Sequence, residues 1–173
     1  MRFPEGDREG GIMKTAIVYY SMSGNCQYAA KSVARRTGAD LIRIEPEKAY
    51  PDSGFKKYFW GGKSAVMGDM PALKPYEFDA DKYERVIFCF PVWAGNVTPP
   101  IRTFISENRA QLKGKKLAAL VCHSGGGGEK PIAKLKAMLG VTELEAELDL
   151  IDPRDKSDSS KDRALEEFCK GLA

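Results

Sequence analysis

A short loop rich in hydroxyl and amide side chains, Ser21-Met22-Ser23-Gly24-Asn25-Cys26, lies between an apolar run and a helical pattern. At a strand-to-helix turn, successive backbone N–H groups converge on one point, and the helix dipole adds partial positive charge there. The loop therefore predicts an anion cradle that binds a phosphate by neutral donors, since it contains no Lys or Arg. An ordinary capped turn remains the alternative, because Ser and Asn are also preferred at helix N-caps.

A second loop, Pro91-Val92-Trp93-Ala94-Gly95-Asn96, carries a large flat aromatic side chain beside a glycine. An exposed indole at a loop tip needs a partner, and a planar ligand stacked on it would cover much of its surface. The alternative is that Trp93 folds under the long segment from residue 47 to residue 84.

A third loop, His123-Ser124-Gly125-Gly126-Gly127-Gly128, contains four consecutive glycines. Such a run costs much backbone entropy on folding, so it is expected where the backbone must come very close to a ligand. We expect its N–H groups to bind the edge of a heterocycle, and a flexible lid is the alternative. For His123 the sequence names no acidic partner, so a hydrogen-bonded residue at a strand end is favoured over a catalyst.

The three loops follow predicted strands. Four apolar runs alternate with helical patterns, as in parallel βαβ units, and a fifth segment alternates polar and apolar residues like an edge strand. These elements predict an α/β fold with three layers, in which helices cover both faces of a doubly wound, five-stranded parallel sheet. Ligands bind beyond the carboxyl ends of such strands. The predicted strands are residues 15–20, 41–44, 86–90, 117–122 and 143–150.

Two segments lie outside this alternation. Residues 1–12 carry Glu5, Asp7 and Glu9 and have no apolar core of a secretory signal, so we expect a flexible tail before a single domain at 13–173. Residues 47–84 are predicted to contain a helix at 55–67, whose aromatic side chains we expect to cover the sheet. These side chains are Phe55, Tyr58, Phe59 and Trp60.

Composition excludes several classes of protein. The 173 residues carry a net charge of only +3, which gives no electrostatic case for nucleic acid, and no apolar stretch approaches the length that spans a bilayer. The four cysteines form no CxxC pair and no zinc-like spacing with the single histidine, so we expect no metal site and a reduced, cytoplasmic setting. Cys89 and Cys122 lie inside apolar runs and are expected to be packed thiols.

Two nucleotide-binding motifs are also absent. The sequence Gly62-Lys63-Ser64 imitates the end of a P-loop, but Lys57 stands where that motif needs glycine. The glycines from 125 to 128 do not satisfy GxGxxG, which argues against a Rossmann dinucleotide site.

Taken together and in this order, the three loops resemble the flavodoxin family over about residues 13–172. SMSGNC is similar to the family's phosphate loop S-x-T-G-N-T, and PVWAG is similar to its ring-flanking loop. The resemblance implies the strand order 2-1-3-4-5 and FMN as the cofactor. It places the phosphate at the first loop, the flavin ring on Trp93, flavin N5 at the Ala94–Gly95 peptide and the pyrimidine edge along the third loop. The implied cofactor-binding residues are Ser21, Met22, Ser23, Gly24, Asn25, Cys26, Pro91, Val92, Trp93, Ala94, Gly95, His123, Ser124, Gly125, Gly126 and Gly127.

The chain departs from the family pattern at several points. Cys26 is a weaker donor than threonine, and its position at a helix N-terminus favours a reactive thiolate. The glycine loop carries no second aromatic residue, which leaves one face of the flavin open. The slightly basic charge weakens the expectation that the protein docks on positively charged redox partners.

Three functions follow from these patterns. The first is a one-electron carrier, a monomer or homodimer that serves redox partner proteins or a small-molecule acceptor, with neither nucleic acid nor membrane as a partner. The second is an NAD(P)H-dependent flavin or quinone reductase on the same fold. The third is a flavodoxin-like interaction module that binds no cofactor.

Overall fold

The computed structural model describes residues 14–51 and 54–173, and for residues 54–60 the backbone alone. The expected tail at residues 1–12 lies outside this part of the chain. Five parallel strands form one sheet in the order β2-β1-β3-β4-β5, so the predicted α/β class and strand order are both confirmed. The strands are β1 (Thr15–Tyr19), β2 (Asp40–Arg43), β3 (Arg85–Pro91), β4 (Lys116–His123) and β5 (Ala146–Ile151).

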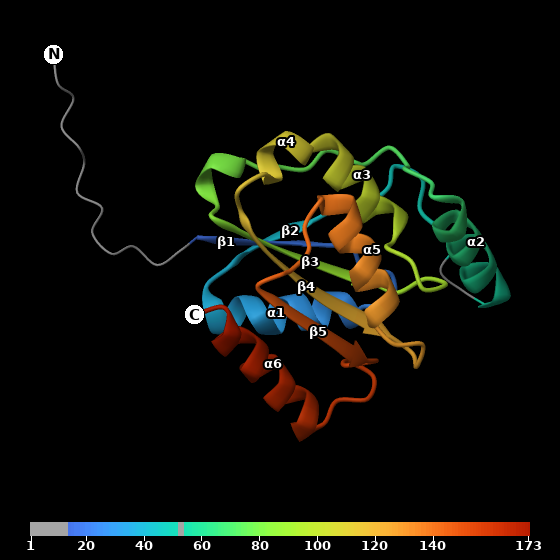
Figure 1. Ribbon diagram of the computed structural model, residues 1–173. Coiled ribbons are helices and arrows are strands. Elements are labelled where there is room, and N and C mark those ends of the chain that lie inside the picture. The colour runs from blue at the N-terminus through green and yellow to red at the C-terminus, as the bar shows by residue number, and fades with distance from the viewer. Residues whose placement is uncertain (1–13, 52–53) are drawn as a thin grey trace, which may run out of the picture.

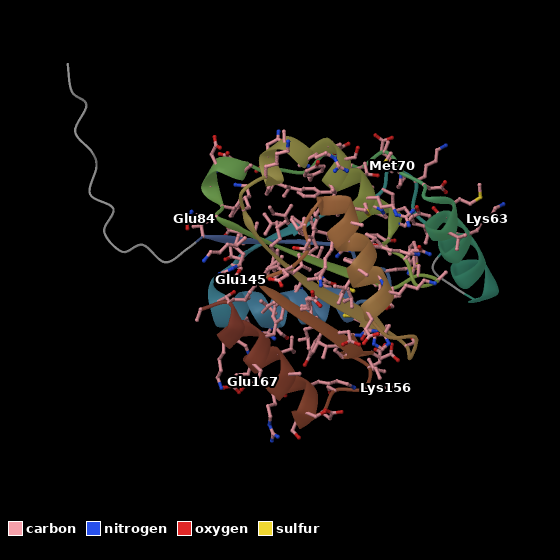
Figure 2. All side chains as sticks on the ribbon, in the orientation of Figure 1. Lys63, Met70, Glu84, Glu145, Lys156 and Glu167 are labelled. Carbon is pink, nitrogen blue, oxygen red and sulfur yellow. The ribbon has the colours of Figure 1, made fainter. Side chains whose placement is uncertain are left out.

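Helices cover both faces of this sheet (Figure 1). On one face α1 (Asn25–Thr37) and α6 (Ser159–Gly171) enclose the core that contains Ile17, Leu120 and Leu165. The larger core, on the opposite face, lies beneath α3, α4 and α5, and Figure 2 shows its side chains filling the space between these helices and the sheet. Those three helices span Pro99–Glu107, Arg109–Leu112 and Glu129–Leu139.

The central strands are apolar because both of their faces are covered, whereas β5 alternates as an edge strand should. This strand begins at Ala146, three residues later than predicted. Glu145, the residue just before the strand, lies at a bend and binds the buried Arg85 with both carboxylate oxygens. The two hydrogen bonds run from Nε to Oε2 at 2.6 Å and from Nη2 to Oε1 at 2.7 Å.

The segment between β2 and β3 contains α2 (Gly54–Met67) and the short 3₁₀ helix η1 (Ala80–Lys82). The predicted helix is confirmed, but it lies beyond the carboxyl edge of the sheet and not over a face (Figure 1). The four aromatic side chains expected to cover the sheet belong to residues 55–60, where the structure describes the backbone alone. Gly61 in this helix packs against Trp93, because a Cβ there would lie 3.3 Å from Cε3 of the indole.

Across residues 14–51 and 54–173, no helix is both long enough and apolar enough to cross a lipid bilayer. The four cysteines are free thiols, and Cys89 and Cys122 are buried as expected.

Candidate functional site

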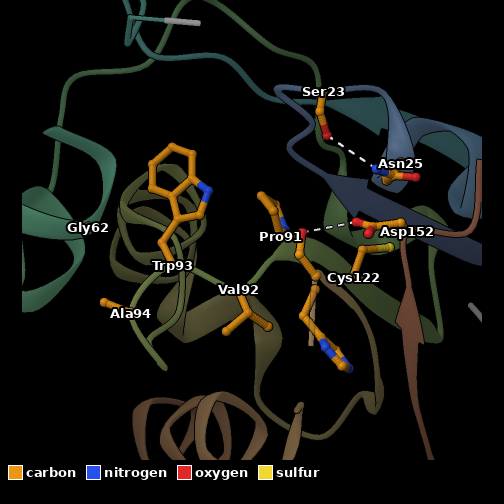
Figure 3. A pocket seen from close by; sticks show the side chains of 11 residues that line it. Ser23, Asn25, Gly62, Pro91, Val92, Trp93, Ala94, Cys122 and Asp152 are labelled. Atoms are coloured by element: carbon orange, nitrogen blue, oxygen red, sulfur yellow. Dashed lines mark hydrogen bonds between the residues drawn. The ribbon is translucent and has the colours of Figure 1, made fainter. Parts of the chain in front are cut away.

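A cavity of about 210 Å³ opens at the carboxyl edge of the sheet, and all three predicted loops contribute to it (Figure 3). It also has walls that the sequence did not predict, from α2 and from the turn after β5. The lining residues are Ser23, Asn25, Gly62, Pro91, Val92, Trp93, Ala94, Cys122, His123, Ser124 and Asp152.

The two serine hydroxyl groups of the first loop have different roles. Ser21 is buried, and its Oγ accepts hydrogen bonds from the backbone N–H groups of Gly24 at 3.2 Å and Gln27 at 3.1 Å. This is the bonding of a capped turn, which satisfies N–H groups at the start of α1. Ser23 is exposed, and together with Asn25 it lines the cavity. Of the two expected serine donors, the structure therefore brings Ser23 to the cavity and uses Ser21 to hold the loop.

The remaining side chains of this loop point into the protein. Met22 packs against the larger core. Cys26 is 1% exposed and lies in the core beneath α1, where burial raises the pKa of its thiol. The expectation of a reactive thiolate at Cys26 is therefore wrong, because desolvation outweighs the field of the helix N-terminus.

Three thiols meet below the loop. The Cys89 thiol donates to the backbone carbonyl of Cys26 at 3.4 Å, and Cys122 is the one of the three that lines the cavity. Burial raises the pKa of Cys26 and Cys89, whereas hydrogen bonding with these two neighbouring thiols lowers the pKa of Cys122.

The second loop is a tight turn closed by a 3.0 Å hydrogen bond from the N–H of Asn96 to the carbonyl of Trp93. Both central residues are left-handed, with φ of 50° at Ala94 and 70° at Gly95, as in a type I′ turn. Alanine is costly in this conformation. The Asn96 amide supports it by donating from Nδ2 to the carbonyl oxygen of Ala94 at 2.8 Å.

Trp93 is half-buried and has aromatic neighbours from two segments. Its ring meets Tyr20 and Tyr50 edge to face, with centroids 5.7 Å and 5.1 Å apart. Tyr50 and Gly61 belong to the 47–84 segment, so the indole does pack beneath that segment. The same indole lines the cavity, as the stacking prediction requires.

The third loop is organised by His123. Its Nδ1 accepts hydrogen bonds from the N–H groups of Gly125 at 3.0 Å and Gly127 at 3.2 Å, and its Nε2 lies 3.0 Å from Oδ2 of Asp149. The histidine is thus a hydrogen-bonded residue at a strand end, and Asp149 is the acidic partner that the sequence did not identify. Two N–H groups that we expected to bind a heterocycle bind this imidazole instead.

The glycine run does make a close approach, but to the protein itself. A Cβ on Gly128 would lie 2.5 Å from Cβ of Asp149 and 2.8 Å from Cγ2 of Val121, so only glycine fits between the loop and the sheet. By contrast, a Cβ on Gly125, Gly126 or Gly127 would meet nothing within 4 Å. Ser124 lines the cavity, and none of these three glycines does.

The turn after β5 supplies residues that sequence reasoning missed. Asp152 has a φ of 37°, lines the cavity, and accepts a hydrogen bond from the Ser124 hydroxyl at 3.0 Å. Arg154 follows two residues later and reaches the first loop. The sequence did contain a signal for this turn. It follows the predicted strand at 143–150, so it lies at the same carboxyl edge as the three loops.

A doubly wound parallel sheet with a cavity among its strand-end loops defines an α/β protein that binds its ligand at the carboxyl edge. Residues 14–158 match the model of the family named Flavodoxin, and the chain belongs to this family. The resemblance drawn from the three loops is therefore confirmed.

Solved structures share the fold. A flavoprotein from Lactobacillus acidophilus NCFM, crystallised in complex with FMN, has a TM-score of 0.69 at 18% identity, with 88% of this chain and 98% of that chain covered. A provisionally assigned flavoprotein from Bacteroides uniformis ATCC 8492 has a TM-score of 0.72 at 18% identity, with 92% and 99% covered. A second such protein, from Bacteroides eggerthii DSM 20697, has a TM-score of 0.70 at 22% identity, with 90% and 98% covered.

Proposed function

We propose that the protein binds FMN in the carboxyl-edge cavity and serves as an electron-transfer protein. The observation that carries the proposal is that Ser23 of the first loop and Trp93 of the second line the same cavity. Membership of the flavodoxin family supports the choice of FMN, as does the fold shared with the FMN complex of the Lactobacillus flavoprotein.

The residues present fit this cofactor. The N-terminus of α1 and the Ser23 hydroxyl offer donors to a phosphate, while Trp93 offers a flat apolar wall to a ring. Ser124 and Asp152 add polar groups on the side of β4 and β5. A cavity of about 210 Å³ is smaller than one that encloses a whole drug-sized ligand, so part of the cofactor would remain in contact with solvent.

When bound, FMN supplies reversible electron transfer in steps of one or two electrons. The protein's part is to orient the ring and to set the charge around it. The Asp152 carboxylate lies in the cavity wall, where its negative charge would oppose the gain of negative charge by a bound ring. Ser124 and Lys156, whose Nζ lies 3.3 Å from Oδ2, hold this carboxylate in place.

An electrochemical titration of the FMN-loaded protein tests the carrier role. We expect two separate one-electron midpoint potentials, because a carrier must stop between its two reduction steps. A single two-electron wave at every pH would contradict the carrier role while leaving FMN binding intact.

A second function, NAD(P)H-dependent flavin or quinone reductase, is favoured by the exposed backbone at Gly125 and Gly126. No aromatic side chain is carried by this loop, so a second planar substrate has room to approach. Steady-state oxidation of NAD(P)H with a quinone acceptor decides between the two roles. A rate above that of free FMN supports the reductase, and a rate equal to it supports the carrier.

A further inference from the structure

The turn after β5 is fastened to the first loop by the side chain of Asn25. Its Oδ1 accepts a 2.9 Å hydrogen bond from the backbone N–H of Arg154, and its Nδ2 donates to Oδ2 of Asp155 at 3.1 Å. Asn25 is 7% exposed, so its own amide group is largely shielded from water. This fastening holds residues 154 and 155 beside the start of α1, across 129 positions of the sequence.

The guanidinium of Arg154 lies directly against Gly24 in the first loop. A Cβ at Gly24 would lie 3.1 Å from Cζ of Arg154 and closer still to Nη1. The loop that contains no cation of its own therefore has one beside it in the folded protein. This positive charge adds to the partial charge at the N-terminus of α1, where an anion is already favoured.

The anion that this cation binds in the structure is the carboxylate of Asp155. Its Oδ1 lies 2.9 Å from Nε and 2.8 Å from Nη2 of Arg154. The two side chains are 51% and 49% exposed, so water screens the pair and its partners can be exchanged at little cost.

We propose that Arg154 selects phosphorylated ligands at the first loop, by moving its guanidinium from Asp155 to the ligand's phosphate. The inference rests on the proposed function and adds a residue and a competing anion to it. A phosphate monoester carries a charge of about −1.5 to −2 at neutral pH and offers three acceptor oxygens, so it outcompetes a carboxylate for a planar guanidinium. Asp155 is then the internal competitor that the phosphate displaces.

Three variants separate the two residues: Arg154→Gln, Asp155→Asn and the double variant. The backbone N–H of residue 154 still donates to Asn25 in each of them, so the turn keeps this hydrogen bond to the first loop. Arg163→Gln removes the same charge from an exposed position in α6 and is the matched control. Dissociation constants for FMN and for riboflavin, which lacks the phosphate, are measured by fluorescence titration at low and at high salt.

We expect Arg154→Gln to weaken FMN binding about 10-fold at low salt, to flatten its salt dependence, and to leave riboflavin binding unchanged. Asp155→Asn should strengthen FMN binding about threefold, since the competing anion is removed. The double variant should bind FMN more weakly than Asp155→Asn alone, and Arg163→Gln should bind as the wild type does.

Several results overturn the inference. Equal losses for FMN and riboflavin in Arg154→Gln would show a general disturbance of the site. A double variant that matches Asp155→Asn would show that the loss came from an uncompensated Asp155, with no contribution from the cation. Wild-type protein that binds neither flavin would instead contradict the proposed function, which keeps the two failures distinct.

Discussion

His123 and Asp149 are joined by a 3.0 Å contact between Nε2 and Oδ2, while Nδ1 of the same ring accepts the N–H groups of Gly125 and Gly127. These partners assign the ring proton to Nε2, because a nitrogen that accepts two N–H groups carries no hydrogen of its own. The imidazole is thus a brace between β5 and the glycine loop. Its removal should loosen the loop, because residues 125–128 are all glycine and have no side chains that could replace these hydrogen bonds.

His123→Ala should therefore speed hydrogen exchange at the amides of Gly125 and Gly127, with exchange elsewhere in β4 little changed. Loss of the three hydrogen bonds should lower the free energy of unfolding by about 1–3 kcal/mol. Ser124→Ala in the same loop is the control, since it leaves the imidazole bonds intact. Unchanged exchange in His123→Ala would show that the brace does not restrain the loop.

The four glycines should differ sharply in their tolerance of substitution. Gly128→Ala places a methyl group against Asp149 and Val121, and should lower the free energy of unfolding by about 1–3 kcal/mol, as in other overpacked sites. Gly126→Ala meets open space and should change it by less than about 0.5 kcal/mol. Chemical denaturation of the two variants provides the measurement, and equal losses would contradict the assigned packing.

The buried thiols should differ in reactivity with iodoacetamide in the native protein. Cys122 should be alkylated before Cys26 and Cys89, because its pKa is lowered and it lines the cavity, whereas burial raises the pKa of the other two. Added FMN should slow the alkylation of Cys122. Peptide mapping by mass spectrometry follows each site. Preferential modification of Cys26 would show that its thiol is the reactive one, and would contradict the assignment made here.

Stability should fall at alkaline pH partly through Tyr83. Burial and the 2.9 Å hydrogen bond to Asp40 raise the pKa of its hydroxyl to about 12 in the folded protein. Because this pKa exceeds the unfolded value of about 10, the stabilisation is complete below pH 10 and is lost as the pH rises towards 12. Tyr83→Phe should flatten this loss in denaturation curves measured between pH 9 and pH 12. If the free energy of unfolding depends on pH in Tyr83→Phe as it does in the wild type, Tyr83 does not contribute to the alkaline loss of stability.

Local patterns predicted the sheet well, because β3 and β4 are covered on both faces and had to be apolar. They also contained one signal that we overlooked. Cys26, Ala29, Ala30 and Val33 recur at helical spacing, and this stripe places Cys26 on the buried face of α1.

Contacts across the sheet edge could not be predicted in this way. Asp149 reaches His123 only because the β4–β5 register pairs Val121 with Asp149 and His123 with Ile151. The bond from Arg154 to Asn25 depends on where the turn after β5 folds back, which no local pattern in the sequence specifies.

FMN binding at the carboxyl-edge cavity is tested by the dissociation constant of FMN for flavin-free wild-type protein and for Trp93→Ala, with Trp93→Phe as a variant that keeps an aromatic wall. We expect saturable binding of one FMN per chain, a loss of affinity of about 10-fold or more in Trp93→Ala, and a smaller loss in Trp93→Phe. Wild-type protein that binds no FMN, or a folded Trp93→Ala variant with undiminished affinity, would contradict FMN binding at this cavity.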